Sequence, residues 1–251
     1  MKSLAILILT CNEEENIVSV VENAKQCTDE VIIIDSGSTD KTVELAKTHG
    51  AKVAFRAWTN DFAAQRNFAL EQTEADWVLY LDADERLNDE LIAEIKRIVE
   101  SGKLDAQYAI TRKSVAFGTT FSYGVLYPDH VLRMFPRVNV TWVNKVHEHP
   151  ECQLPAKYLP GYIEHYTYKD WHEWEEKLCL YTTIWAKDAY RRGKRTTLPG
   201  IFTHSLGGFF KMFFIRRGFL DGYVGMYMCC NHFFYTMLKY LKLHELQRRG
   251  A

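Results

Sequence analysis

Short apolar runs alternate with helix-like segments through the first hundred residues of the chain. The apolar runs have the length and composition of strands that are buried on both faces of a sheet. These predicted strands are Leu4–Leu9, Val31–Asp35, Lys52–Phe55 and Asp76–Leu81. The predicted helices are Asn12–Gln26, a segment that ends near Gly50, Phe62–Gln72 and Asn88–Glu100. This order predicts an α/β fold with an open, mostly parallel sheet and helices on both faces.

The pattern changes in the second half of the chain. Gln107–Thr120 and Val131–Phe135 are predicted strands, which we expect at a mixed or antiparallel edge of the same sheet. Trp171–Arg192 is predicted to be helical, Thr196–Pro199 to interrupt the chain, and Phe202–Leu246 to form a largely helical tail. A helical C-terminal extension therefore follows the sheet.

Composition narrows the class of protein. The 251 residues are 47% hydrophobic and 25% charged, which is ordinary for globular proteins and excludes disordered, collagen-like and low-complexity fibrous chains. A net charge of −1 excludes a polycation that binds nucleic acid over its whole surface. The six cysteines form no CxxC pair, which favours a reducing compartment over a disulfide framework or structural zinc.

No segment has the pattern of a signal peptide or a membrane-spanning helix. Leu4–Leu9 is too short for a signal peptide and acidic residues follow it at once. Phe219–Leu238 is fairly apolar, but it contains Asp221, Asn231 and His232, which a spanning helix rarely tolerates. We expect a protein without a transmembrane helix, either cytoplasmic or peripheral to a membrane.

The near-zero net charge hides an asymmetry between two parts of the chain. Residues 185–251 carry twelve Lys and Arg against three Asp and Glu, a net of +9, and fourteen of the thirty-four aromatic residues. Residues 1–184 carry a net of −10. Basic residues mixed with aromatics suit an anionic membrane surface or a nucleic acid. We therefore expect a domain at 1–184, with halves 1–103 and 104–184, and a separate basic, aromatic tail at 185–251.

Polar residues follow three of the predicted strands. They are Thr10-Cys11-Asn12-Glu13, Asp35-Ser36-Gly37-Ser38 and Asp82-Ala83-Asp84. In open α/β sheets, ligands bind outside the carboxyl ends of the strands. Asp82 and Asp84 could together hold a hard cation such as Mg²⁺, which in turn binds a diphosphate. The alternative is a solvated helix N-terminus, where Asp84 merely favours the helix dipole.

The chain lacks the glycine-rich motifs that cradle phosphates. Neither GxGxxG nor GxxxxGK[ST] occurs, so a metal and a cationic side chain would have to hold a diphosphate. Arg66, on the helix before the fourth strand, is a candidate for that cation. The alternative is an ordinary arginine on a helix surface.

Several motifs in order resemble the family 2 glycosyltransferases of GT-A fold. They are Leu4–Asn16, Ile33–Asp40, Gln65-Arg66-Asn67 and Asp82-Ala83-Asp84-Glu85. Three later segments are similar to the bacterial lipopolysaccharide and lipooligosaccharide core β-1,4-glucosyltransferases. They are Val143–Glu148, Ile163–Tyr166 and Arg217–Gly222.

The resemblance implies a donor site and a metal site. The implied donor-binding residues are Thr10, Glu13, Asp35, Arg66 and Asp82, and the implied ligands of Mg²⁺ or Mn²⁺ are Asp84, Asp82 and His165. Asp35 would accept a hydrogen bond from the uracil, although an Asp before Ser-Gly also commonly forms a turn. His165 could equally be a hydrogen-bonded histidine of the protein core.

Inverting members of the family use a carboxylate to deprotonate the acceptor hydroxyl, and many carry a Glu-Asp pair there. This chain has Val146-His147-Glu148-His149 instead, so Glu148 is the expected general base. His147 could also accept the proton. Alternatively, Glu148 could be an ion-pair partner of Lys145 or Arg133.

The implied activity is inverting, metal-dependent transfer of a hexose, glucose from UDP-glucose, to a heptose of the lipopolysaccharide inner core. The implied partners are the nucleotide sugar, a lipid A–core acceptor and the anionic inner face of the bacterial inner membrane, with no role for nucleic acid. The alternatives are another acceptor, such as a capsular glycan, polyprenyl phosphate or peptide, or a catalytically silent nucleotide-sugar-binding module. The aromatic tail could instead pack on the catalytic domain or form an oligomer interface.

Overall fold

The structure is a computed structural model that describes residues 2–145 and 148–250. The chain divides into two compact units. The sheet unit comprises Met1–Arg112 and Asp129–His165, and the helical unit comprises Lys113–Pro128 and Tyr166–Ala251. The boundary expected at residue 185 falls inside a helix, Trp171–Arg191, which clusters with the later helices.

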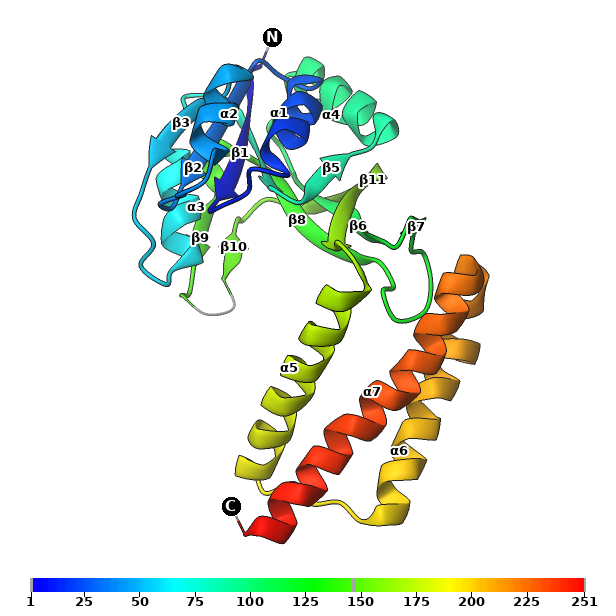
Figure 1. Ribbon diagram of the computed structural model, residues 1–251. Helices are drawn as coiled ribbons and strands as arrows, with labels where there is room; N and C mark the ends of the chain where they lie inside the picture. Colours follow the sequence, from blue (N-terminus) through cyan, green and yellow to red (C-terminus); the bar gives the residue numbers. More distant parts are fainter. Residues whose placement is uncertain (1, 146–147, 251) are drawn as a thin grey trace. The chain divides into compact units, whose positions relative to one another are not determined.

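The sheet has the strand order β3-β2-β1-β4-β8-β6-β11-β5 within the described residues, with β7 paired to β6 (Figure 1). The strands are β1 (Leu4–Thr10), β2 (Glu30–Asp35), β3 (Lys52–Phe55), β4 (Trp77–Asp82), β5 (Glu85–Leu87), β6 (Gln107–Ala116), β7 (Thr119–Thr120), β8 (Asp129–Pro136) and β11 (Ala156–Tyr168). A separate hairpin pairs β9 (Thr141–Val143) with β10 (His149–Glu151). The short 3₁₀ helix η1 (Arg137–Asn139) precedes that hairpin.

The parallel part of the sheet brings three strand ends to one edge. β1 pairs in parallel with β2 and β4, so Thr10 lies opposite Asp35 and Leu9 lies opposite Asp82. β8 pairs antiparallel with β4 and with β6. The prediction of a mixed edge after residue 104 is confirmed.

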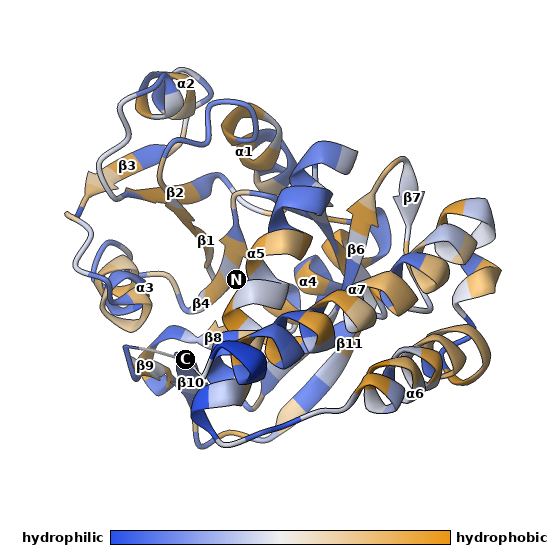
Figure 2. Cartoon of the chain, turned by 60° about the horizontal axis from the view of Figure 1, so that its bottom comes forward, coloured by the Kyte–Doolittle hydropathy of each residue, from blue (hydrophilic) through white to orange (hydrophobic). Residues whose placement is uncertain are grey.

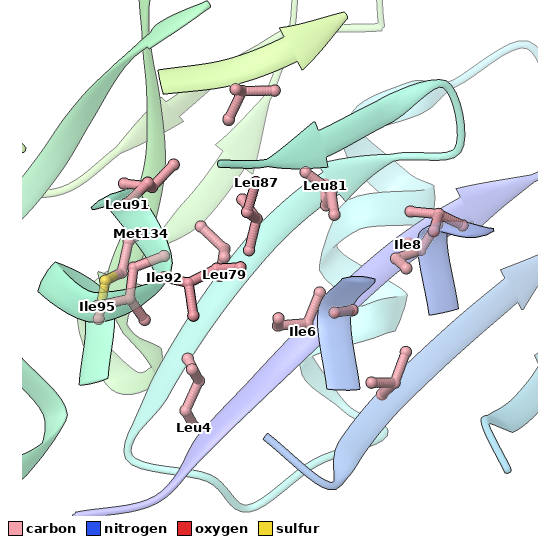
Figure 3. Packing of buried hydrophobic residues seen from close by; sticks show 14 of the residues in the cluster. Leu4, Ile6, Ile8, Leu79, Leu81, Leu87, Leu91, Ile92, Ile95 and Met134 are labelled. Atoms are coloured by element: carbon pink, nitrogen blue, oxygen red, sulfur yellow. The ribbon is translucent and has the colours of Figure 1, made fainter. Parts of the chain in front are cut away.

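Helices cover both faces of the sheet, as predicted. Helices α1 (Ile17–Lys25), α2 (Thr42–Thr48) and α4 (Asp89–Ser101) contribute to one apolar cluster, and α3 (Phe62–Leu70) contributes to the other. β1 supplies alternate residues to the two clusters because successive side chains of a strand point to opposite faces. Figure 3 shows Leu4, Ile6 and Ile8 of β1 on the same side as residues of α4.

Three features of the sheet unit differ from the sequence-based expectation. Helix α1 begins at Ile17 and not at Asn12, because Asn12 adopts a left-handed conformation with φ of 57°. The strands β5 and β11 were not predicted, since β5 has three residues and β11 contains Pro160 and Gly161. Gly161 has φ of 82°, and a Cβ there would lie 2.5 Å from the Leu91 nitrogen, so this strand requires a glycine where it meets α4.

The helical unit is built around its longest helix. Its helices are α5 (Trp171–Arg191), α6 (Leu198–Phe210) and α7 (Gly222–Arg249), and both α5 and α6 pack on α7. The largely helical tail predicted at Phe202–Leu246 is confirmed, and a π-helical turn, η2 (Lys211–Ile215), and a 3₁₀ turn, η3 (Gly218–Asp221), separate α6 from α7. None of the helices in the described part of the chain has the length and apolar character needed to cross a membrane.

The segment Arg217–Gly222 has a structural role in this unit. Asp221 accepts hydrogen bonds from the backbone amides of Ser122 (3.1 Å) and Tyr123 (2.9 Å). Gly218 packs so closely that a Cβ there would lie 2.4 Å from the Cys229 sulfur. The segment therefore fixes the loop before residue 128 against the start of α7.

His232 on α7 makes the stability of the helical unit depend on pH. Burial, and then Lys239 and Lys211, lower its pKa from 6.5 to about 4. The unfolded chain therefore binds this proton first, and the free energy of unfolding should fall as the pH decreases from about 6.5 to about 4. Urea unfolding at several pH values should show a smaller pH dependence for His232→Gln. An unchanged pH dependence would contradict this assignment.

Candidate functional site

A cleft of about 480 Å³ lies at the carboxyl edge of the parallel strands. This volume is within the usual range for sites that bind small molecules. The cleft brings together six of the residues expected from the sequence, together with an aromatic pair that was not expected. Its lining residues are Leu9, Thr10, Cys11, Glu13, Ser36, Trp58, Phe62, Gln65, Arg66, Asp82, Ala83, Asp84 and Glu148.

The loops after β1 and β2 are tied together by reciprocal hydrogen bonds. The amide of Asn12 donates to Ser38 Oγ (2.9 Å), and the amide of Thr39 donates to Asn12 Oδ1 (2.8 Å). The amide of Glu13 donates to Thr42 Oγ1 at 2.8 Å. The left-handed conformation of Asn12 thus serves to join the two loops, which holds this wall of the cleft in place.

Asp35 lies at the end of β2 but not in the lining of the cleft. Its carboxylate accepts hydrogen bonds from the amide of Gly37 (2.9 Å) and from the amide and hydroxyl of Ser38. The contacts of Asp35 within the chain are therefore those expected of a turn-forming aspartate before Ser-Gly. Its neighbour Ser36 reaches the cleft, and a contact between Asp35 and uracil stays a prediction.

The turn Asp82-Ala83-Asp84 joins β4 to β5 and is held from within the protein. Glu85 Oε2 accepts a hydrogen bond from the amide of Asp82 at 3.0 Å. The guanidinium of Arg86 donates to the carbonyl oxygens of Ala83 (2.7 Å) and Glu85 (2.6 Å). These contacts fix the direction in which the two aspartates leave the backbone.

The side chain of Asp82 belongs to a buried network of charges. Arg133 Nη2 lies 2.7 Å from Asp82 Oδ2 and 2.8 Å from Glu85 Oε1, and Arg66 Nη2 lies 3.2 Å from Asp82 Oδ1. Arg112 Nη1 lies 3.5 Å from Glu85 Oε1. Both oxygens of Asp82 therefore face arginines, and the structure favours Asp82 as an anchor for them over a direct metal ligand.

Burial and the neighbouring arginines have opposite effects on the pKa values of the two carboxylates in this network. Burial alone would raise the pKa of Asp82, but Arg133 and Arg66 outweigh it and hold the pKa well below its usual range. Burial raises the pKa of Glu85, which Arg133 opposes. Asp82 is thus anionic at neutral pH and orients Arg66.

Arg133 and Arg112 are residues that sequence reasoning missed as parts of the site. They come from the antiparallel strands β8 and β6. The available signal was a single arginine within each otherwise strand-like segment, but the partners of these arginines lie far away in the sequence. Arg133 contacts Asp82 and Glu85, so the proposed alternative of an Arg133–Glu148 ion pair does not account for its position.

Arg66 lies in the wall of the cleft with unused hydrogen-bonding capacity. Its guanidinium packs over the rings of Trp142 (4.6 Å) and Tyr80 (5.6 Å), and its side chain is only 8% exposed. Its Nε and Nη1 groups have no hydrogen-bond partner among residues 2–145 and 148–250, and neither has the buried hydroxyl of Thr10. Buried donors without partners are costly, so these groups suit a polar, anionic ligand.

Asp84 and His165 form the second polar pair of the site. β11 pairs antiparallel with β5 so that His165 lies opposite Glu85, and His165 Nε2 lies 3.1 Å from Asp84 Oδ2. Two ligands that are each about 2.1 Å from an octahedral cation lie about 3 Å apart, so this spacing fits a shared metal. Residues 2–145 and 148–250 contain no group of three or more His, Cys, Asp or Glu side chains suited to a metal. A cation here would depend on water or substrate for its remaining ligands.

Glu148 also lines the cleft, immediately before β10. The hairpin that carries it is anchored to α3, because Asn67 donates to the carbonyl of Trp142 and accepts from its amide, both at 2.8 Å. The alternative base His147, together with Val146, lies outside the described residues. The structure thus places the expected base in the same cleft as Asp84.

An aromatic pair at the cleft was not anticipated from the sequence. Trp58 and Phe62 pack edge to face at 4.5 Å, and their side chains are 40% and 46% exposed. The indole of Trp58 donates to Asn60 Oδ1 at 3.1 Å. The pair offers an exposed apolar surface beside the polar groups of the site.

Comparisons with known proteins identify the family of this chain. The family described as Glycosyl transferase family 2 matches residues 5–152. An uncharacterized glycosyltransferase of Rickettsia typhi is 33% identical over all of this chain and 89% of that protein. The lipopolysaccharide core biosynthesis glycosyltransferase LpsC of Rhizobium meliloti is 26% identical over 98% of this chain and 94% of that protein.

Some solved structures are similar to part of this chain. Glucosyl-3-phosphoglycerate synthase of Mycobacterium tuberculosis, solved with Mn²⁺ and UDP-glucose, is 23% identical over 45% of this chain and 43% of that one, with a TM-score of 0.34. The open mixed sheet, its covering helices and the C-terminal helical region agree with the expected GT-A fold. Because the family match covers more than half of the chain, the protein belongs to glycosyl transferase family 2.

Proposed function

We propose that this transferase is an inverting, metal-dependent enzyme that moves glucose from UDP-glucose to a heptose of the lipopolysaccharide inner core. The observation that carries the proposal is the convergence of Arg66, Asp84 and Glu148 on one cleft, with His165 Nε2 3.1 Å from Asp84 Oδ2. The similarity to LpsC, a lipopolysaccharide core biosynthesis glycosyltransferase, supports the choice of acceptor.

The reaction is a single displacement at the anomeric carbon of the donor. The acceptor oxygen forms a bond to that carbon as the bond to UDP breaks on the opposite side, so an α-linked donor yields a β-linked product. Glu148 takes the proton from the acceptor hydroxyl. UDP leaves with the bonding electron pair, and its negative charge has to be stabilised.

The residues of the donor wall supply that stabilisation. Arg66, oriented by Asp82, offers the diphosphate its Nε and Nη1 groups, which have no hydrogen-bond partner in the described part of the chain. Asp84 and His165 would hold Mg²⁺ or Mn²⁺, a Lewis acid that neutralises charge on the leaving group. Thr10 and Glu13 lie along the same cleft, in the positions where the nucleoside is proposed to bind.

The proposed acceptor implies a location. A lipid A–core molecule is anchored in the inner membrane, so the enzyme would act as a peripheral protein on the cytoplasmic face of that membrane. Capsular glycan, polyprenyl phosphate and peptide acceptors are the alternatives that the acceptor assay must separate.

Release of UDP tests the proposal. Purified protein is incubated with UDP-glucose and either Mg²⁺ or Mn²⁺, with and without deacylated core oligosaccharide, and UDP is measured. We expect release that requires the metal, stops with a chelator and rises with the acceptor. A panel of other nucleotide sugars and acceptors serves as the control, and faster transfer with one of them would overturn the choice of substrates.

His165→Asn tests the metal pair separately. Loss of the imidazole beside Asp84 should raise the metal concentration needed for half-maximal activity about 10- to 100-fold. The matched control is His172→Asn, whose side chain is 81% exposed on α5. Titration of Mn²⁺ against UDP release provides the measurement, and equal metal requirements for the two variants would exclude His165 from the metal site.

A further inference from the structure

Helix α6 contains no charged residue along its whole length, Leu198–Phe210. Helices at a protein surface in water usually carry charged side chains on the face that points away from the core. In Figure 2, α6 is mostly orange and pale, whereas the C-terminal end of α7 is blue. The composition of α6 therefore does not match that of a helix exposed to water on one side.

One face of α6 nevertheless lacks protein cover. Large apolar side chains recur at every fourth position and stay about half exposed: Leu198 (57%), Phe202 (56%), Leu206 (48%), Phe210 (53%) and, in the following turn, Phe214 (57%). Residues four positions apart follow one another along a helix surface. These five residues, here called the α6 stripe, form a continuous apolar strip.

A different face of α6 packs within the helical unit. Ile201 and Ser205 are buried. Gly208 lies so close to α7 that a Cβ there would be 3.1 Å from Thr236 Oγ1. Because α6 already contacts α7 through these positions, the α6 stripe is not the face that the unit uses for its own core.

Basic residues flank the α6 stripe at both ends. The segment 194–217 contains five Lys and Arg residues and no Asp or Glu. They are Lys194 and Arg195 before the helix and Lys211, Arg216 and Arg217 after it. An apolar strip bordered by cations complements a surface that is apolar inside and anionic at its edge.

We infer that the α6 stripe inserts into the interfacial region of an anionic lipid membrane, with α6 lying in the plane of the surface. The helix has 13 residues, too few to cross a bilayer. A symmetric contact between two copies of this stripe would bring like charges together, which disfavours a homodimer as its occupant. The inference extends the proposed function, because a membrane-anchored acceptor would lie at such a surface.

Flotation with lipid vesicles tests the inference without any nucleotide sugar. The full chain is mixed with phosphatidylcholine vesicles, or with vesicles that also contain phosphatidylglycerol, and centrifuged through a density gradient. We expect the protein to float with the anionic vesicles and to dissociate as salt increases. Failure to float with either vesicle would overturn the inference and would leave the UDP-release result unaffected.

Paired variants identify the face that binds. Phe202→Ser with Phe210→Ser should weaken vesicle binding at least about tenfold, since each removes an apolar side chain from the bound surface. The matched control is Leu180→Ser with Ile184→Ser, which alters two equally exposed residues (55% and 54%) on α5. Circular dichroism checks that both variants fold. Equal losses in the two variants, or a dimer in solution that only the α6 variant disrupts, would contradict the inference.

Discussion

Glu148→Gln should lower kcat for sugar transfer about 10²- to 10⁴-fold, the usual contribution of a general base. Glutamine keeps the size and polarity of the side chain but cannot take the proton of the acceptor hydroxyl. Glu148 lines the same cleft as Asp84 and Arg66 and is not one of the residues of the buried charge network, so the change should spare both folding and donor binding. The loss should therefore appear in kcat and not in the affinity for UDP-glucose.

The matched control for this experiment is Glu151→Gln. Glu151 is an exposed carboxylate on β10, in the same hairpin, but it does not line the cleft. Initial rates give kcat, and calorimetric titration with UDP gives donor-site affinity. A Glu148→Gln enzyme that transfers sugar as fast as Glu151→Gln would remove Glu148 from the mechanism and turn attention to His147.

The parallel half of the fold could be predicted because its signals are local. The apolar runs of β1, β2 and β4 and the polar residues that follow them are contiguous in the sequence. Parallel pairing then places Thr10, Asp35 and Asp82 at one edge without further information. These features needed no knowledge of which distant strands pair.

The antiparallel half could not be predicted to the same extent, because its structure depends on pairing between distant segments. β11 has an irregular burial pattern and gains its place by pairing with β5. That pairing is what brings His165 to Asp84. From the sequence, His165 was a candidate ligand by resemblance only.

The roles of the two aspartates in the Asp82-Ala83-Asp84 motif also could not be predicted from the sequence. In the sequence they are equivalent acids one residue apart. In the structure, Asp82 faces two arginines, whereas Asp84 faces His165, and the two side chains are similarly exposed (32% and 37%). Their partners distinguish them, and these partners come from α3, β8 and β11, outside the motif. The distinction between an aspartate that anchors arginines and one that is paired with a histidine therefore needed coordinates.

Arg133→Met should destabilise the sheet unit by about 3–5 kcal/mol, since the change leaves charges buried without their principal partner. Arg133 contacts both Asp82 and Glu85, and the Glu85 side chain is fully buried. The comparison variant is Arg137→Met, which removes an ion pair with Glu74, whose carboxylate is 90% exposed, and a hydrogen bond to the carbonyl oxygen of Ala75. That pair should contribute no more than about 1 kcal/mol. Urea unfolding of both variants measures the difference.

A double variant separates electrostatic loss from lost packing. If the cost of Arg133→Met is an uncompensated carboxylate, adding Glu85→Gln should recover part of the stability, because the amide can still contact the Asp82 turn without a buried charge. If the cost is packing around the arginine, the two changes should destabilise additively. Additivity, or a single-variant loss no larger than that of Arg137→Met, would show that the network does not hold the Asp82-Ala83-Asp84 turn. The orientation of Arg66 toward the donor site would then need another explanation, because Asp82 is its ion-pair partner.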